Sequence, residues 1–195
     1  MKYTLYKPVF ALILITASSV FAQTERDKGI ELYKQGRDLE AIRVLQQVAK
    51  QKATKTDAEV WNYLGLAYVN QNKTKEGRKA LEKAVKFAPE NSVYRSNLAY
   101  VHLLTRKVDK AQSEVSKAIQ LDPNNANAFY VSGIANLWEN KYDRALTDAE
   151  RTIAINPQFT VAYILKSDAL MSNFGKVWME ESNPRENLNL LEQAA

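Results

Sequence analysis

Residues 58–91, AEVWNYLGLAYVNQNKTKEGRKALEKAVKFAPEN, decide the fold. Apolar side chains recur three or four positions apart in both halves of this stretch, from Trp61 to Tyr68 and again from Leu81 to Ala88, which is the spacing of an α-helix. Polar residues 70–75 separate the two patterns, and Pro89 follows the second because proline cannot continue a helix interior. The stretch therefore predicts two helices joined by a short turn.

The same unit recurs every 34 residues. Four columns of the sequence keep this period: Pro89, Pro123 and Pro157; Gly65, Ala99, Gly133 and Ser167; Gly77, Ala111 and Ala145; and Leu81, Val115 and Ala149. Turns are predicted at residues 70–75, 105–109 and 139–143. Self-similarity at such a period indicates an array of helix pairs, each packed against its neighbours.

The unit resembles the tetratricopeptide repeat (TPR), whose signature is W-x2-L-G-x2-Y followed by Ala, a large apolar residue, Ala and Pro. Three residues depart from it: Gly77 stands where the family usually has Ala, and Arg95 and His102 stand in aromatic columns. The resemblance implies an all-α fold, a TPR α-solenoid of antiparallel helix pairs. Its structural repeat positions are Trp61, Leu64, Gly65, Tyr68, Pro89, Ala99, Ala111, Pro123, Gly133, Ala145 and Pro157.

About five repeats are expected by this comparison, the first and last of them degenerate. Residues 58–91, 92–125 and 126–159 are good repeats, residues 23–57 are a degenerate first repeat and residues 160–195 a degenerate last one. Phe174-Gly175 predicts a helix stop, residues 174–184 an irregular link, and Asn183-Pro184 the start of a final helix. An apolar helical pattern then continues to residue 195, an edge through which copies of the chain could self-associate.

Residues 1–22 have the pattern of a signal peptide. Lys2 and Lys7 precede an uncharged run over residues 9–22, which is shorter than the roughly 20 apolar residues that a membrane-spanning helix needs. The run ends Val20-Phe21-Ala22, which suits cleavage before Gln23. We therefore expect an exported protein, periplasmic or secreted; the alternative is an uncleaved N-terminal anchor, and membrane contact is otherwise expected only through the envelope setting.

The composition excludes several kinds of chemistry. The chain has no cysteine and one histidine, so a thiolate site and a multi-histidine zinc site are excluded. It also lacks a Gly-x-Ser-x-Gly elbow, a phosphate-binding glycine loop and a His-Glu-x-x-His motif. We predict no enzyme activity, no catalytic residue, no metal and no cofactor, and we interpret His102 as a packing residue. Removal of Lys2 and Lys7 lowers the net charge from +5 to +3, so a nucleic-acid partner is not expected.

The TPR resemblance places a partner-binding groove on the concave face, lined by the first helix of each repeat. The candidate groove residues are Tyr33, Asn62, Val69, Asn70, Ser96, Tyr100, Leu103, Tyr130, Leu137, Trp138 and Asp168. The alternative for some of them is packing against the neighbouring helix. Residues 23–125 carry a net charge of +6 and residues 126–195 one of −3, which either steers a partner or only solvates outer helix faces.

These observations favour a non-catalytic protein–protein interaction scaffold that binds a peptide or helix of a partner outside the cytoplasm. The alternative is the TPR segment of a larger envelope transport protein or TonB-like energy-transducing protein. A receptor for acidic C-terminal tails is disfavoured, because Ile30, Val93 and Asn97 stand where that TPR subtype needs Asn and basic side chains.

Overall fold

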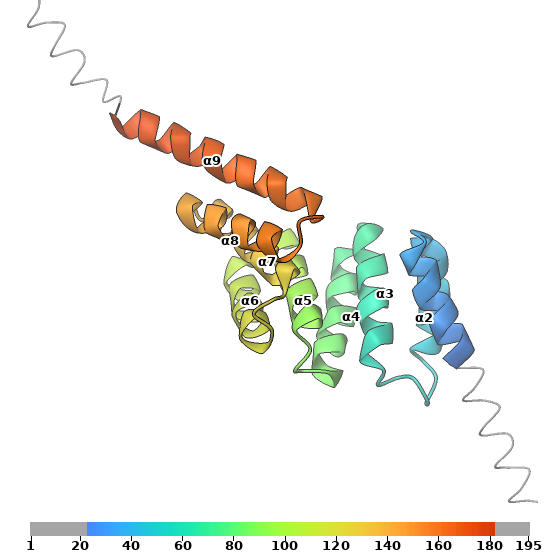
Figure 1. The fold of residues 1–195 in the computed structure, drawn as a ribbon. Coiled ribbons are helices and arrows are strands. Elements are labelled where there is room, and N and C mark those ends of the chain that lie inside the picture. The colour runs from blue at the N-terminus through green and yellow to red at the C-terminus, as the bar shows by residue number, and fades with distance from the viewer. Residues whose placement is uncertain (1–22, 182–195) are drawn as a thin grey trace, which may run out of the picture.

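The computed structural model describes residues 23–181 of the chain, with side chains through residue 174. Its helices stack side by side in chain order (Figure 1), and this part of the chain contains no strand. A first helix covers residues 23–34, and it is followed by α2 (Asp38–Val48), α3 (Ala58–Asn70), α4 (Thr74–Phe87), α5 (Ser92–Leu104), α6 (Val108–Leu121), α7 (Ala126–Trp138), α8 (Tyr142–Ile155) and α9 (Thr160–Glu181). Since α3, α5, α7 and α9 begin 34 residues apart, the all-α solenoid and its period are confirmed.

The two helices of a repeat are joined by a short turn that contains one left-handed residue. These residues are Gly36, Asn72, Arg106 and Asn140, with φ of 73°, 58°, 57° and 59°. After α3, the N–H of Asn72 donates to the carbonyl of Val69 (2.9 Å) and that of Lys73 to the carbonyl of Tyr68 (2.9 Å). This Schellman pair satisfies two carbonyls at the helix end and recurs at the other three turns. The predicted turns are confirmed.

The link from one repeat to the next is fixed by N-cap side chains. Asp57, Asn91 and Asn125 precede α3, α5 and α7, and each accepts a hydrogen bond from a backbone N–H in the first turn of the helix that follows. Each cap stabilises its helix by about 1 kcal/mol. The periodic prolines are exposed residues of these links, just beyond the ends of α4, α6 and α8.

The small-residue columns bring the two helices of a repeat close together. A Cβ added at Gly65 would lie 2.6 Å from Cγ of Leu81, and one added at Gly77 would lie 2.9 Å from the carbonyl oxygen of Gly65. Ala99, Ala111 and Ala145 are fully buried at the equivalent positions. The structural interpretation of these columns is confirmed, and Gly77 departs from the usual Ala because α3 and α4 leave no room for a methyl group.

Three of the four residues in the column that begins at Trp61 have a second role besides packing. Nε1 of Trp61 donates to the carbonyl of Lys55 (2.8 Å), Nε of Arg95 donates to that of Pro89 (2.7 Å), and the hydroxyl of Tyr163 donates to that of Pro157 (3.1 Å). Each donor satisfies a carbonyl six residues earlier, in the link between repeats. Arg95 therefore replaces an aromatic donor, and its NH1 also pairs with Glu114 (2.7 Å).

His102 is buried, as its interpretation as a packing residue requires. Its Nδ1 has no hydrogen-bond partner within the described part of the chain. Burial lowers the pKa of His102, and the positive charge of Lys110 lowers it further. The neutral imidazole is therefore the form that the helix packing favours.

The last helix differs from the prediction. The sequence predicted a stop at Phe174-Gly175 and an irregular link over 174–184, but α9 continues through Gly175 to Glu181. A single glycine weakens a helix by only about 1 kcal/mol relative to alanine, so it ends a helix only where the chain also turns into the left-handed conformation. The predicted helix start at Asn183-Pro184 and the signal peptide over residues 1–22 lie outside the described residues.

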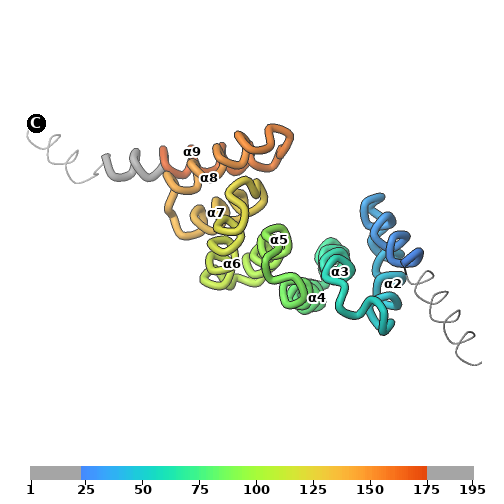
Figure 2. The backbone as a smooth tube through the Cα atoms, turned by 60° about the horizontal axis from the view of Figure 1, so that its bottom comes forward, coloured from blue at the N-terminus to red at the C-terminus, as the bar shows by residue number. Residues whose placement is uncertain are grey.

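The array curves toward the first helices of its repeats. α3 contacts α5, α5 contacts α7 and α7 contacts α9, whereas α4, α6 and α8 do not contact one another. Neighbouring repeats are thus closest on the side of the first helices, and Figure 2 shows the stack turning along its length. The concave face lies on α3, α5, α7 and α9, as the TPR resemblance implies.

Candidate partner-binding groove

Eight of the predicted groove residues are accessible on or beside the concave face. Asn70 and Trp138 are exposed, and the other six are half-buried: Tyr33, Val69, Tyr100, Tyr130, Leu137 and Asp168. Because the second helix of each repeat packs behind, these side chains present one side to the array and the other to solvent. The accessible surface is therefore mostly aromatic and aliphatic.

Asn62, Ser96 and Leu103 are corrected from groove residues to packing residues. They are only 4%, 0% and 1% exposed, because the first helix of the next repeat covers them. The alternative that some of these positions pack against the neighbouring helix is right for these three. A partner on the concave face does not touch them.

A chain of hydrogen bonds between polar side chains crosses the first helices at this level. Nδ2 of Asn97 donates to Oδ1 of Asn62 (2.9 Å), and Nδ2 of Asn127 donates to Oδ1 of Asn97 (3.2 Å) and to Oγ of Ser96 (3.0 Å). Asn125 extends the chain by donating to Ser96 Oγ (3.3 Å). The network joins α3, α5 and α7, so it holds the floor of the groove in one arrangement.

The N-terminal end of the groove is a cluster of tyrosines beside an ion-paired arginine. The rings of Tyr33 and Tyr63 lie 5.2 Å apart. Burial raises the pKa of Tyr33, and for Tyr94 burial and then the carboxylate of Glu59 raise it. These phenols therefore stay neutral and can donate a hydrogen bond.

Arg26 is the charged centre of this cluster. Its Nε donates to Asp57 (2.6 Å), its NH1 donates to Asp27 (2.7 Å), and its NH2 pairs with Glu59. Burial of the guanidinium opposes its charge, but the hydrogen bonds that it donates to Asp57 and Asp27 outweigh burial and raise the Arg26 pKa. The group ties the first helix to α3, which makes it a link between repeats.

The C-terminal part of the groove is also aromatic. The rings of Tyr130 and Phe159 lie 5.1 Å apart, and burial raises the pKa of the Tyr130 hydroxyl. The guanidinium of Arg106 lies over the ring of Trp138, 4.3 Å from its centroid, and holds that side chain at the groove edge. Both anchors are therefore positioned before any partner arrives.

Sequence reasoning missed Tyr63, Tyr94, Asn97, Asn127 and Phe159. Tyr63, Asn97 and Asn127 lie three positions before or one position after a predicted groove position, on the adjacent row of the same helix surface. A wider helical arc would have included them. Tyr94 and Phe159 fall outside these rows, because their approach to the groove depends on how neighbouring repeats pack.

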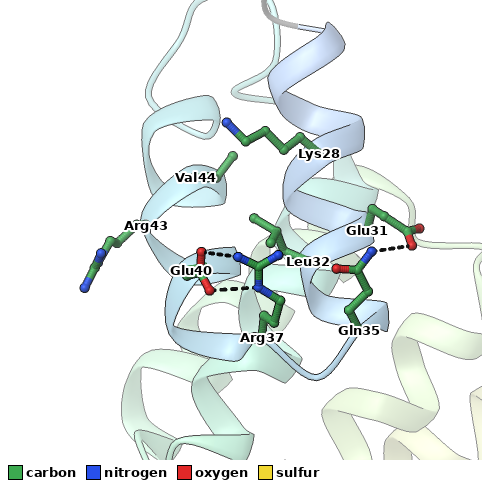
Figure 3. A pocket seen from close by; sticks show the side chains of 8 residues that line it. All are labelled: Lys28, Glu31, Leu32, Gln35, Arg37, Glu40, Arg43 and Val44. Carbon is green, nitrogen blue, oxygen red and sulfur yellow. Dashed lines mark hydrogen bonds and ion pairs between the residues drawn. The ribbon is translucent and has the colours of Figure 1, made fainter.

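A second depression lies away from this groove, between the first helix and α2 (Figure 3). Its volume is about 410 Å³, and its lining residues are Lys28, Glu31, Leu32, Gln35, Arg37, Glu40, Arg43 and Val44. Arg37 donates to both carboxylate oxygens of Glu40 (2.8 and 2.6 Å), and Gln35 donates to Glu31 (3.0 Å). Four of its polar side chains thus form two pairs with one another. Because these groups already have partners, we propose no ligand for the depression.

The described residues contain no candidate metal site and no candidate membrane span. Among them, no group of three or more His, Asp or Glu side chains is placed to hold a metal ion. Within the same part of the chain, no helix is both long and apolar enough to cross a membrane.

The fold and the repeat columns define the class: the chain is a tetratricopeptide repeat protein. A sequence model described as Tetratricopeptide repeat matches residues 58–91. A search of curated proteins finds no match.

Solved structures of the same class superpose over most of the chain. MamA of MSR-1 is 27% identical, with 90% of this chain and 99% of that chain covered and a TM-score of 0.63. MamA of AMB-1 is 27% identical, with 88% and 99% covered and a TM-score of 0.64. The Arabidopsis OM64 TPR domain shares the fold, at 22% identity, 57% and 93% coverage and a TM-score of 0.53. Proteins of this class generally serve as protein–protein interaction scaffolds without catalysis of their own.

Proposed function

We propose that the protein is a non-catalytic scaffold that binds a peptide or helix of a protein partner along its concave face. One observation carries the proposal: half-buried aromatic side chains follow one another along the inner face, from Tyr33 and Tyr63 through Tyr100 to Tyr130. Trp138 adds a partly exposed indole at the edge. Aromatic residues in such positions are the commonest anchors of protein interfaces.

The energetics favour binding by these anchors. Tyr130 is held by its contact with Phe159 and Trp138 by Arg106, so little side-chain freedom is lost when a partner docks. The hydrogen-bonded asparagines beneath them keep the spacing of α3, α5 and α7 fixed. An apolar side chain of the partner that enters between two anchors is removed from water on both sides. The backbone of the partner can form hydrogen bonds with the tyrosine hydroxyls.

The experiment compares partners retained from native envelope extracts by the protein and by single variants. If these side chains are hot spots, Trp138→Ala and Tyr100→Ala should each weaken the binding of a specific partner by about 2 kcal/mol, which is an increase of about 30-fold in Kd. Phe87→Ala is the matched control, because Phe87 is 36% exposed at the end of α4, away from the groove. Circular dichroism checks that each variant is folded. Partners retained equally by all variants would refute groove binding.

We also propose that the protein works outside the cytoplasm. The support is the pattern of residues 1–22, in which a basic start, a short uncharged run and a small residue before Gln23 follow in order. Cell fractionation with N-terminal sequencing tests it: the expected product begins at Gln23 and lies in the envelope or medium fraction. A cytoplasmic product that begins at Met1 contradicts the proposal.

A further inference from the structure

α9 carries the largest group of exposed apolar side chains among the described residues. Ile164, Met171 and Phe174 are 61%, 64% and 72% exposed, and the other members of this group are Val161, Tyr163 and Leu170. At 100° per residue, the six span about half of the helix circumference, and Thr160, Ser167 and Asp168 lie within the same arc. We call this surface the α9 face.

The opposite side of the helix is fully packed. Ala162, Leu165 and Ala169 are buried, and Lys166 pairs with Glu150 of α8 (2.9 Å). Among the labelled helices, α9 contacts only α7 and α8. It lies at the outer end of the stack (Figure 1), so within the described residues no helix covers the α9 face.

The same positions are covered in α5 and only half-buried in α7, at Tyr130 and Leu137. Ser96 and Leu103 of α5, which correspond to Ile164 and Met171, are 0% and 1% exposed, and Ala99, which corresponds to Ser167, is fully buried. Interior repeats fill this space with the next helices of the array. Ser167 is exposed, yet it keeps the small side chain that lets a second helix approach closely. The α9 face therefore has the shape of a helix-binding surface.

We propose that the α9 face binds the α9 face of a second copy of this chain, antiparallel and around a two-fold axis at Ser167. A two-fold interface is self-complementary, so a residue that precedes the axis meets one that follows it by the same number of positions. Tyr163 and Met171 lie four positions from Ser167 on either side, and Ile164 and Leu170 lie three. Every one of these opposed pairs is apolar.

The size and charge of the surface also suit a second copy. The larger side chains have surface areas of about 150–250 Å² each, so the exposed fractions of the six residues give about 600 Å² of accessible surface per chain. Two copies would together bury about 1,200 Å², which is the lower end of the range for specific interfaces. The charged neighbours are kept off its centre: Asp168 is half-buried at the edge, and Lys166 pairs on the far side.

The first experiment measures oligomeric state by sedimentation equilibrium, on the full chain expressed with its own N-terminal segment. The expected result is a dimer. The dissociation constant of this dimer should rise at least tenfold in Ile164→Glu and in Met171→Glu. Leu39→Glu is the matched control, because Leu39 is 55% exposed on α2 at the other end of the array, and it should remain a dimer. A monomeric full chain overturns the proposal, and so does a dimer that all three variants retain.

Deletion of residues 182–195 distinguishes two possible occupants of the α9 face, a second copy of the chain and a segment of the same chain. If that segment covered the α9 face, the full chain would be a monomer and the shortened chain would become a dimer, which overturns the proposal. The expected result is a dimer in both.

The second experiment uses the absence of cysteine in the sequence. In a helix pair about 8–10 Å apart, facing Cα atoms lie about 3.5–5.5 Å from each other, which overlaps the range of a disulfide. Ser167→Cys should therefore form a covalent dimer under mild oxidation, and addition of Ile164→Glu should prevent it. Ser113→Cys, an exposed serine of α6, is the control and should stay monomeric on denaturing gels. Equal cross-linking of both cysteine variants contradicts the two-fold axis at Ser167.

Discussion

Gly65→Ala tests whether the close approach of α3 and α4 is set by the small-residue columns. The new Cβ would lie 2.6 Å from Cγ of Leu81 and 3.1 Å from the carbonyl oxygen of Gly77, although carbon atoms in contact are normally about 3.5–4.0 Å apart. Leu81 is fully buried and Cγ is its branching atom, so it cannot swing aside. The helices must separate by a fraction of an ångström, or Leu81 must leave its rotamer.

The magnitude follows from two opposing terms. Overpacking a well-packed core costs about 1–3 kcal/mol. Replacing a helical glycine by alanine returns about 1 kcal/mol of helix propensity. The two terms leave a net loss of about 0–2 kcal/mol, so we expect Gly65→Ala to lower the free energy of unfolding by about 1 kcal/mol, which is a fall of about 2–4 °C in melting temperature for a chain of this size.

The next repeat supplies the compensating change. Ala99 stands opposite Val115 there, whereas Gly65 stands opposite Leu81. Leu81→Val alone should cost about 1 kcal/mol, but it removes bulk next to the new methyl group. The double variant should therefore be more stable than the sum of the two single effects by about 1 kcal/mol. Urea denaturation followed by circular dichroism measures all four proteins; an unchanged Gly65→Ala midpoint, or strict additivity, would refute the reasoning.

Three further predictions concern stability. Burial lowers the pKa of His102 from 6.5, so the unfolded chain binds this proton at a higher pH than the folded chain does. The contribution of His102 to stability is therefore complete above pH 6.5 and declines below it. His102→Leu should remove that decline in urea titrations between about pH 7.5 and 5.5. Asn72→Ala should lower the unfolding free energy by about 1 kcal/mol, because Asn72 is left-handed, whereas Asn72→Gly and the control Asn124→Ala should change the midpoint little. Asp57→Ala removes the cap of α3 and the Arg26 partner, and a loss of about 2 kcal/mol is expected in the same assay; a smaller loss than for Asn91→Ala would contradict a joint role.

Much of the fold could be predicted because its signals are local. The spacing of Trp61, Leu64 and Tyr68 indicates a helix, the prolines mark where each repeat ends, and the period of 34 says that one unit is repeated. The turns could be predicted for the same reason, but the residue with the left-handed conformation in each turn could not. Arg106 occupies that conformation in one turn where asparagine does in two others, so residue type alone does not locate it.

The binding groove was predicted less well, because exposure is a property of two elements together. Asn62 and Tyr130 occupy equivalent positions, yet the first is buried and the second is half-buried, since the helix that covers each of them is different. Arg95 departs from the aromatic column, yet it donates to the carbonyl of Pro89 as Trp61 donates to that of Lys55. Neither fact is present in the pattern of a single helix.

The sequence by itself determined the helix pairs, their period and the close approach at Gly65 and Gly77, because these depend on residues within one repeat. Only the tertiary structure decided that α9 continues past Gly175, that three predicted groove residues are covered, and that the α9 face is open within the described chain. The physical reason is the same in each case: a side chain is buried or free according to what packs on it from the neighbouring repeat.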